Sequence, residues 1–139
     1  MRRRYWLLKS DPATFGWPDL EKAEGRRTVW DGVRNYQARN ILRDEVRRGD
    51  GVLFYHSQSD KAIIGTCTVK SSGFPEPKNA TWTAIEIAFE SKFDAPVTLE
   101  AMRMVSRLSK MALLRRGSRL SVQPVTEVEW AIVLTMGRG

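Results

Sequence analysis

The chain has 139 residues, a formal net charge of +7, 42% hydrophobic residues, five tryptophans and one cysteine. This length fits a single domain over residues 1–139 with one hydrophobic core, and a lone cysteine excludes an internal disulfide and a multi-cysteine metal site. No run of about 20 apolar residues suits a membrane span, and the N-terminus lacks the pattern of a signal peptide. We therefore expect a cytoplasmic protein that uses no metal or other cofactor.

The positive charge is concentrated in two parts of the chain. Seven arginines lie between residues 26 and 48, and six basic residues lie between 103 and 119 with no acid among them. The part between these two carries more acids than lysines. Such asymmetry favours a polyanionic partner, although a solvated basic face that only aids solubility has the same composition.

In the first half of the chain the patterns predict four elements. They are a strand over residues 5–9, a helix that starts at Pro18, a brief strand over 28–30 and an amphipathic helix after the Asp31-Gly32 turn. Arg39, Arg43 and Arg47 recur every fourth residue, which places them together beside the apolar face of that last helix.

The second half of the chain is richer in strands. We expect a hairpin of strands over 52–56 and 62–69, a proline-stiffened loop at 74–77, a long strand over 81–93, a helix capped by Thr98, a strand over 120–125 and a closing helix. Thr126 and Glu129 have the spacing of a capping box for that helix. Many short strands with few helices between them predict an α+β fold with a mixed, highly curved sheet or small barrel.

The segment WDGVRNYQARN, residues 30–40, combines a tryptophan, a glycine turn, two arginines and several side-chain amides. One interpretation is structural: Trp30 ends a core strand, and the residues after it start a helix with capping groups. The other interpretation is a pocket for a nucleobase. A reader of a modified base must take the base out of its stack and offer it an aromatic face and hydrogen-bonding groups.

Together with KSDP (9–12), FYHS (54–57), RLSVQPVT (119–126) and the final EW (129–130), this segment resembles the EVE domain family, which is related to PUA-like domains. The resemblance covers nearly the whole chain. It implies a PUA-like mixed-sheet pseudo-barrel surrounded by short helices, without catalytic activity. It also implies recognition of nucleic acid that carries modified bases, most directly modified cytosine in DNA, with modified RNA as the alternative. KSDP stands where the family often has KSEP, and the run before RLSVQ is more basic than usual.

These patterns assign candidate residues to two roles. The candidate base pocket comprises Ser10, Trp30, Val33, Asn35, Tyr36, Tyr55, Ser57 and Ser121. The candidate residues for binding the nucleic-acid backbone are Lys9, Arg34, Arg39, Arg43 and Arg119. Trp30 would stack on the base, while Ser10, Asn35 and Ser57 would bind its edges.

Several of these residues also have a structural interpretation. Tyr36 and Tyr55 suit a core as well as a pocket, and alternation along the strand places Phe54 and Tyr55 on opposite faces, so that one of the two should be buried. Lys9 could pair with Asp11 at the surface. Arg119, Ser121 and Gln123 would share one face of their strand, as a solvated face or as a groove wall.

Two other function classes are compatible with the sequence. His56, the only histidine, could form a catalytic dyad with Cys67, although no third group that would orient the histidine is evident. Alternatively, the basic surface could bind an acidic protein. A partner nuclease or RNA-processing proteins would be expected beside a reader, and the sequence alone does not choose between DNA and RNA.

Overall fold

The computed structural model describes residues 3–58, 60–115 and 120–138. In chain order the elements are β1 (Tyr5–Ser10), α1 (Trp17–Lys22), η1 (Glu24–Arg26), β2 (Arg27–Trp30), α2 (Tyr36–Asp44), β3 (Gly51–His56), β4 (Ala62–Val69), β5 (Phe74–Glu76), β6 (Asn79–Thr98), α3 (Leu99–Arg103), η2 (Ser106–Leu108), η3 (Ala112–Leu114), β7 (Val122–Val125) and α4 (Glu127–Gly137). The elements expected from the sequence are present, with β6 longer than predicted. The expected loop at 74–77 was wrong, because β5 occupies most of it and pairs with β6. Pro75 is tolerated there because β5 is a short edge strand.

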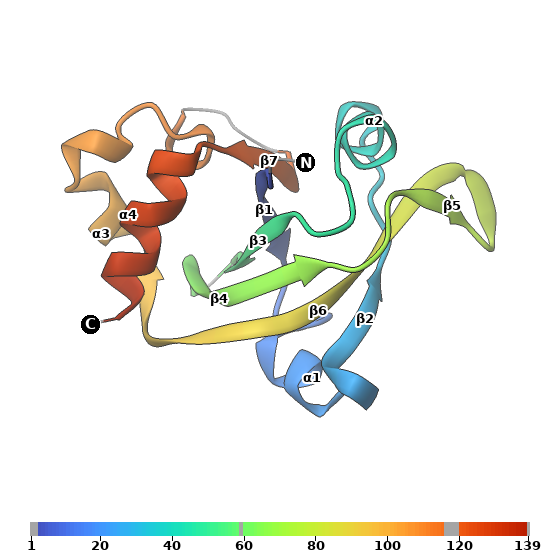
Figure 1. Cartoon of the computed structure of the whole chain (residues 1–139), viewed down its shortest axis with the longest axis horizontal. Coiled ribbons are helices and arrows are strands. Elements are labelled where there is room, and N and C mark those ends of the chain that lie inside the picture. The colour runs from blue at the N-terminus through green and yellow to red at the C-terminus, as the bar shows by residue number, and fades with distance from the viewer. Residues whose placement is uncertain (1–2, 59, 116–119, 139) are drawn as a thin grey trace.

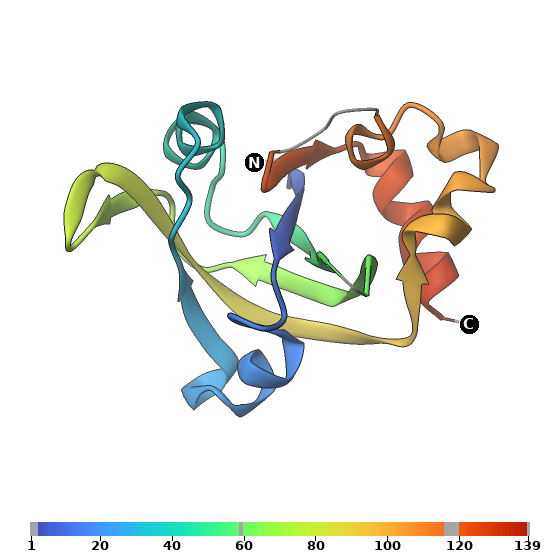
Figure 2. The same ribbon diagram turned by 180° about the vertical axis from the view of Figure 1, so that it is seen from behind.

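The strands form one curved mixed sheet in the order β2-β6-β4-β3-β1-β7, with β5 attached to β6. β1 and β3 are parallel, and the other pairs are antiparallel. Figures 1 and 2 show the long β6 passing under β4 and ending beside α3 and α4, while α2 and the β5–β6 hairpin lie at the other end. The α+β fold with a mixed, highly curved sheet surrounded by short helices is thus confirmed.

Two hydrophobic clusters lie on opposite faces of this sheet, which corrects the expectation of one core. Alternate residues of β3 belong to different clusters: Val52 and Phe54 pack with Trp6 in the first, while Leu53 and Tyr55 pack in the second. Phe54 and Tyr55 are therefore both buried, and the expectation that only one would be was wrong. A central strand with core on both faces buries both of its side-chain rows.

Local capping explains where three helices begin. The Asn35 side chain accepts a hydrogen bond from the Ala38 N–H and starts α2, and the Thr98 hydroxyl caps α3 in the same way. Thr126 and Glu129 form the predicted capping box of α4. Each cap satisfies a backbone donor that a helix start leaves without an intrahelical partner.

Most of the tryptophans, and the cysteine, are buried in the hydrophobic core. Trp6, Trp17 and Trp130 are buried, whereas Trp82 is half-buried. Cys67 is fully buried, as a core thiol should be, and burial raises the pKa of its thiol. The thiolate, which is the reactive form, is therefore suppressed at neutral pH.

Candidate functional site

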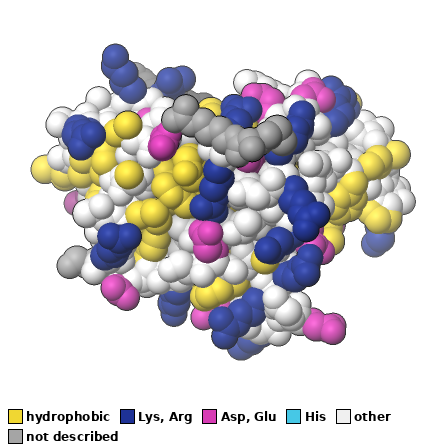
Figure 3. Space-filling model, in the orientation of Figure 1, with side chains coloured by type: hydrophobic (Ala, Val, Ile, Leu, Met, Phe, Trp, Pro, Cys, Tyr) yellow, Lys and Arg dark blue, Asp and Glu magenta, His cyan; other side chains and the backbone are white. Residues whose placement is uncertain are grey.

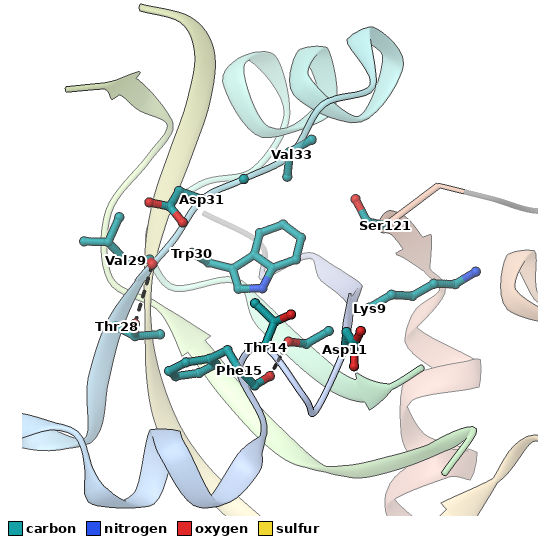
Figure 4. A pocket seen from close by; sticks show the side chains of 12 residues that line it. Lys9, Asp11, Thr14, Phe15, Thr28, Val29, Trp30, Asp31, Val33 and Ser121 are labelled. Atoms are coloured by element: carbon teal, nitrogen blue, oxygen red, sulfur yellow. Dashed lines mark hydrogen bonds between the residues drawn. The ribbon is translucent and has the colours of Figure 1, made fainter. Parts of the chain in front are cut away.

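A cavity of about 350 Å³ lies where the end of β1, the end of β2 and the segment before β7 meet. Figure 4 shows the Trp30 indole in the middle of the lining, with Val33, Ser121 and Thr14 around it. The lining consists of Lys9, Ser10, Asp11, Thr14, Phe15, Thr28, Val29, Trp30, Asp31, Gly32, Val33 and Ser121. Residues of KSDP, WDGVRNYQARN and RLSVQPVT thus meet at one place, and the volume lies at the lower end of the roughly 300–1,000 Å³ common for small-ligand sites.

The turn after β1 forms one wall of the cavity and is held by its own hydrogen bonds. The Ser10 hydroxyl donates to the carbonyl oxygen of Phe15. The Asp11 carboxylate accepts from the Ala13 N–H through Oδ1 at 2.9 Å, and the Asp11 carbonyl accepts from the N–H groups of Thr14 and Phe15. Because the Ser10 proton is already engaged, its oxygen can only accept a hydrogen bond from a ligand.

The opposite wall starts at Trp30, the last residue of β2. Trp30 pairs with Ile85 of β6, and the residue is 8% exposed. Gly32 has a φ of +83°, a conformation that residues with a Cβ rarely adopt, and nothing would contact a Cβ built there. Gly32 is therefore required for its backbone angle rather than for space, and the turn it makes places Val33 beside the indole (Figure 4).

A buried acid from β5 braces this second wall. Glu76 accepts hydrogen bonds from the Gly32 N–H at 3.2 Å and from both terminal nitrogens of Arg34 at 2.8 and 3.0 Å. The Arg34 guanidinium also lies 5.2 Å from the ring centroid of Trp82. The hydrogen bond from Arg34 holds the pKa of the Glu76 carboxyl below its ordinary value of 4.5. The loop at 31–34 is thus tied to the β5–β6 hairpin.

We predict that Glu76→Ala releases the loop without unfolding the protein. The Gly32 amide should exchange its hydrogen about tenfold faster, which corresponds to about 1.4 kcal/mol of easier local opening. Hydrogen exchange followed by NMR measures this, with Glu86→Ala, which removes the partner of Arg27 at the surface, as the control. An unchanged Gly32 rate in Glu76→Ala would show that the brace does not hold the loop.

The same brace has a defined pH dependence. Because the folded-state pKa of Glu76 is lowered, its contribution is fully present above pH 4.5 and is lost as the pH falls through the lowered pKa. We therefore expect the exchange rate of the Gly32 amide in the wild type to become equal to the rate in Glu76→Ala only below pH 4.5. The two rates are measured side by side at each pH. Convergence at a higher pH would contradict this assignment.

The lining combines an apolar, flat surface with charged and polar groups. Trp30, Val33 and Phe15 provide the apolar part. Lys9 and Asp11 provide opposite charges at the end of β1, and burial lowers the pKa of the Lys9 ammonium. A ligand that brings hydrogen-bond acceptors or negative charge to Lys9 offsets that cost. The arrangement suits a planar ligand with an apolar face and polar edges.

The predicted base-pocket residues divide into two groups of four. Ser10, Trp30, Val33 and Ser121 line the cavity. Asn35, Tyr36, Tyr55 and Ser57 are not among the described residues that line it.

Each of these four residues has another position in the structure. Asn35 caps α2, and Tyr36, 60% exposed, stacks on Trp82 with ring centroids 5.0 Å apart. Tyr55, 4% exposed, lies in the second cluster. Ser57 holds the end of β1 in place, because its N–H donates a hydrogen bond to the Ser10 carbonyl.

The residues predicted to bind the backbone also occupy different positions. Lys9 lines the cavity, and Arg34 forms an ion pair with Glu76. Arg39 donates to Asn40 and to the Thr81 carbonyl, and Arg43 pairs with Asp44 at 2.8 Å. Arg119 lies outside the described residues.

The basic side chains do not form one block on the face that Figure 3 shows. On the face in Figure 3, Lys and Arg side chains are spread among Asp and Glu, with hydrophobic groups over the β5–β6 hairpin and between α3 and α4.

The sequence analysis did not assign three of the lining residues, Asp11, Phe15 and Asp31, to the pocket. Their positions were the available signal, because Asp11 belongs to KSDP, Phe15 lies shortly after that motif and Asp31 follows Trp30.

The structure contradicts a dyad of His56 and Cys67. Cys67 pairs with Val52 across the β3–β4 hairpin, and His56 lies four residues further along β3, which is about 13 Å at the rise of a strand. The His56 Nε2 accepts from the Trp17 N–H, and its Nδ1 is 2.9 Å from Asp60.

In the described part of the chain, no helix is long and apolar enough to cross a membrane and no group of three or more metal-ligating side chains occurs.

The EVE domain model matches residues 4–136. The chain belongs to the EVE domain family. An uncharacterized Schizosaccharomyces pombe protein is 33% identical to this EVE domain over 162 residues, covering 95% of the chain and 67% of the relative. The resemblance read from the four motifs is thereby confirmed.

Solved structures share the fold of this EVE domain. Rpa0253 from Rhodopseudomonas palustris superposes with a TM-score of 0.88 at 38% identity, covering 96% of this chain and 92% of that one. Human THYN1, solved in complex with DNA that contains 5-methylcytosine, superposes with a TM-score of 0.87 at 27% identity and covers 98% of both chains. The expected PUA-like fold is confirmed by these neighbours.

Proposed function

We propose that this EVE domain binds DNA and takes a modified cytosine, most directly 5-methylcytosine, out of the duplex into the Trp30 cavity. The observation that carries the proposal is the convergence of three family motifs on one cavity with an indole in its lining. The 5-methylcytosine DNA complex of the structurally similar human THYN1 supports the choice of ligand.

The energetics of the cavity suit a flipped base. Stacking a base on an aromatic side chain contributes about 1–3 kcal/mol, while unstacking and unpairing cost a few kcal/mol. Stacking on Trp30 alone therefore does not suffice, and hydrogen bonds from the polar lining must supply the rest. A methyl group that meets the apolar lining adds about 0.8 kcal/mol, or about a fourfold preference over unmodified cytosine.

The net charge supports the contribution of the DNA backbone. With a charge of +7, the domain attracts a polyanion, and Lys9, Arg39 and Arg43 lie on the elements that border the cavity or follow it. Contacts to phosphate depend steeply on salt but carry no base information. The proposal therefore assigns affinity mainly to the basic side chains and selectivity to the cavity.

The test is fluorescence-anisotropy binding of matched DNA and RNA duplexes that carry 5-methylcytosine or cytosine at one position, at about 50 and 200 mM salt. We expect tighter binding to methylated DNA, by about fourfold, at both salt concentrations, with a steep overall loss at the higher one. Equal binding to both DNA duplexes would refute the proposal. A methyl preference confined to RNA would instead assign the cavity to modified RNA, and no binding to either would favour an acidic protein partner.

A further inference from the structure

A pocket for 5-methylcytosine faces a problem that its apolar surface does not solve. Thymine carries the same methyl group at the same ring position, and stacking on Trp30 is as favourable for one pyrimidine as for the other. The two bases differ in the group at position 4, which is an amino donor in cytosine and a carbonyl acceptor in thymine. Because thymine is abundant in DNA, a selective reader needs a group that distinguishes a donor from an acceptor at that position.

The described lining of the cavity contains two carboxylates, those of Asp11 and Asp31, and a carboxylate only accepts hydrogen bonds. Asp11 is half-buried, whereas Asp31 is exposed, and water screens an exposed carboxylate more strongly. Asp11 is also held in place, because its Oδ1 accepts from the Ala13 N–H. A carboxylate has about four lone-pair sites, so Asp11 keeps acceptor capacity for a ligand.

Lys9 completes a matching edge. It lines the same cavity two residues before Asp11, and an ammonium group only donates hydrogen bonds. Cytosine presents a donor at position 4 and acceptors at the ring nitrogen and at position 2. The Asp11 carboxylate can accept from the group at position 4, and the Lys9 ammonium can donate to the acceptors at the other end of this edge. Thymine would place its position 4 carbonyl against a carboxylate, which leaves both acceptors without a donor and repelling each other.

We infer that Asp11 is the residue that selects cytosine over thymine, by accepting a hydrogen bond from the amino group of the flipped base. This inference rests on the proposed function and goes beyond it, because it names the edge of the base that is read. Asp11 discriminates the bases, Trp30 supplies the stacking face, and the apolar lining supplies the preference for the methyl group.

The test uses four duplexes in which cytosine, 5-methylcytosine, uracil or thymine stands opposite an abasic site, so that no base pair must be broken. The four bases separate the effect of the methyl group from the effect of the amino group. For the wild type we expect 5-methylcytosine to bind about tenfold more tightly than thymine, and cytosine to exceed uracil by a similar factor. Anisotropy titrations at one salt concentration measure all four affinities.

Asp11→Asn should bring the preference for 5-methylcytosine over thymine to about twofold or less, because an amide can present either a donor or an acceptor. The preference for 5-methylcytosine over cytosine should stay unchanged. The asparagine oxygen can still accept from Ala13, so the turn keeps its hydrogen bond. Asp31→Asn, which makes the same chemical change in the same lining, is the matched control and should retain both preferences.

The outcomes separate the two proposals. If the wild type prefers 5-methylcytosine to cytosine but binds thymine equally well, the inference is overturned and the proposed function stands. If Asp11→Asn keeps the discrimination against thymine, or if Asp31→Asn loses it instead, Asp11 is not the discriminating residue. If the wild type does not distinguish 5-methylcytosine from cytosine, the proposed function fails and the inference fails with it.

Discussion

Replacing Trp30 with alanine is expected to abolish base-selective binding while leaving the salt-dependent binding of unmodified duplex DNA nearly unchanged. Loss of the stacking face removes about 1–3 kcal/mol, which is roughly a 5- to 150-fold weakening for the flipped base. Contacts to phosphate do not involve the indole and should persist. Anisotropy titrations with methylated and unmethylated duplexes, compared at the same salt concentration, measure both quantities.

Trp30 also belongs to the first hydrophobic cluster, so the experiment needs a variant that keeps this cluster filled. Trp30→Leu retains apolar volume but has no aromatic face, and it should lose selectivity as Trp30→Ala does. Tyr36→Ala removes an exposed aromatic ring outside the cavity lining and should keep selectivity. Selectivity that survives in Trp30→Leu, with circular dichroism showing a folded protein, would mean that the base does not stack on Trp30.

The elements and caps of this fold were predictable because they follow from local sequence. Thr98, Thr126 and Glu129 act on backbone groups within three residues, so their hydrogen bonds do not depend on the rest of the chain. The run of β-branched, aliphatic and aromatic residues at 52–56 likewise identified a strand. The pattern did not reveal that both faces of β3 are buried, because that depends on α4 and the 3-10 segments packing on the second face.

The candidate site was predictable only in part, for the same physical reason. Trp30 and Ser10 were found because each lies in a short motif of neighbouring residues. The partner of Arg34 is Glu76, which is 42 residues away, and no local pattern connects the two. Asn35 illustrates the converse: the structural interpretation as a helix cap was available from the sequence, and it is the one the structure shows.

A second large effect is expected from Asp50, a buried acid at the opposite end of β1 from the cavity. Asp50 is 3% exposed and accepts three hydrogen bonds, from the Arg4 N–H at 3.1 Å, the Trp6 Nε1 at 2.9 Å and the Arg47 N–H at 2.9 Å. Arg4 directly precedes β1, Trp6 lies in β1, and Arg47 lies in the turn after α2. One carboxylate therefore joins the start of β1, the end of the α2 segment and β3.

Asp50→Ala should lower the free energy of unfolding by about 2–4 kcal/mol, because it leaves buried donors without an acceptor. Asp50→Asn should lie in between, since one of its two terminal atoms is a donor and cannot replace a carboxylate oxygen. Urea unfolding followed by circular dichroism measures both variants. Asp44→Ala, which removes an exposed acid and the same charge, is the control and should have little effect.

The comparison of Asp50 with Asp44 tests how a chain of net charge +7 uses its acids. If simple charge balance mattered most, the two alanine variants would lose similar stability, since each raises the net charge by one. If hydrogen bonding in the interior matters most, only Asp50→Ala is strongly destabilised. We expect the second result, because solvent screens the pair at Asp44, while the buried Trp6 indole N–H loses its acceptor.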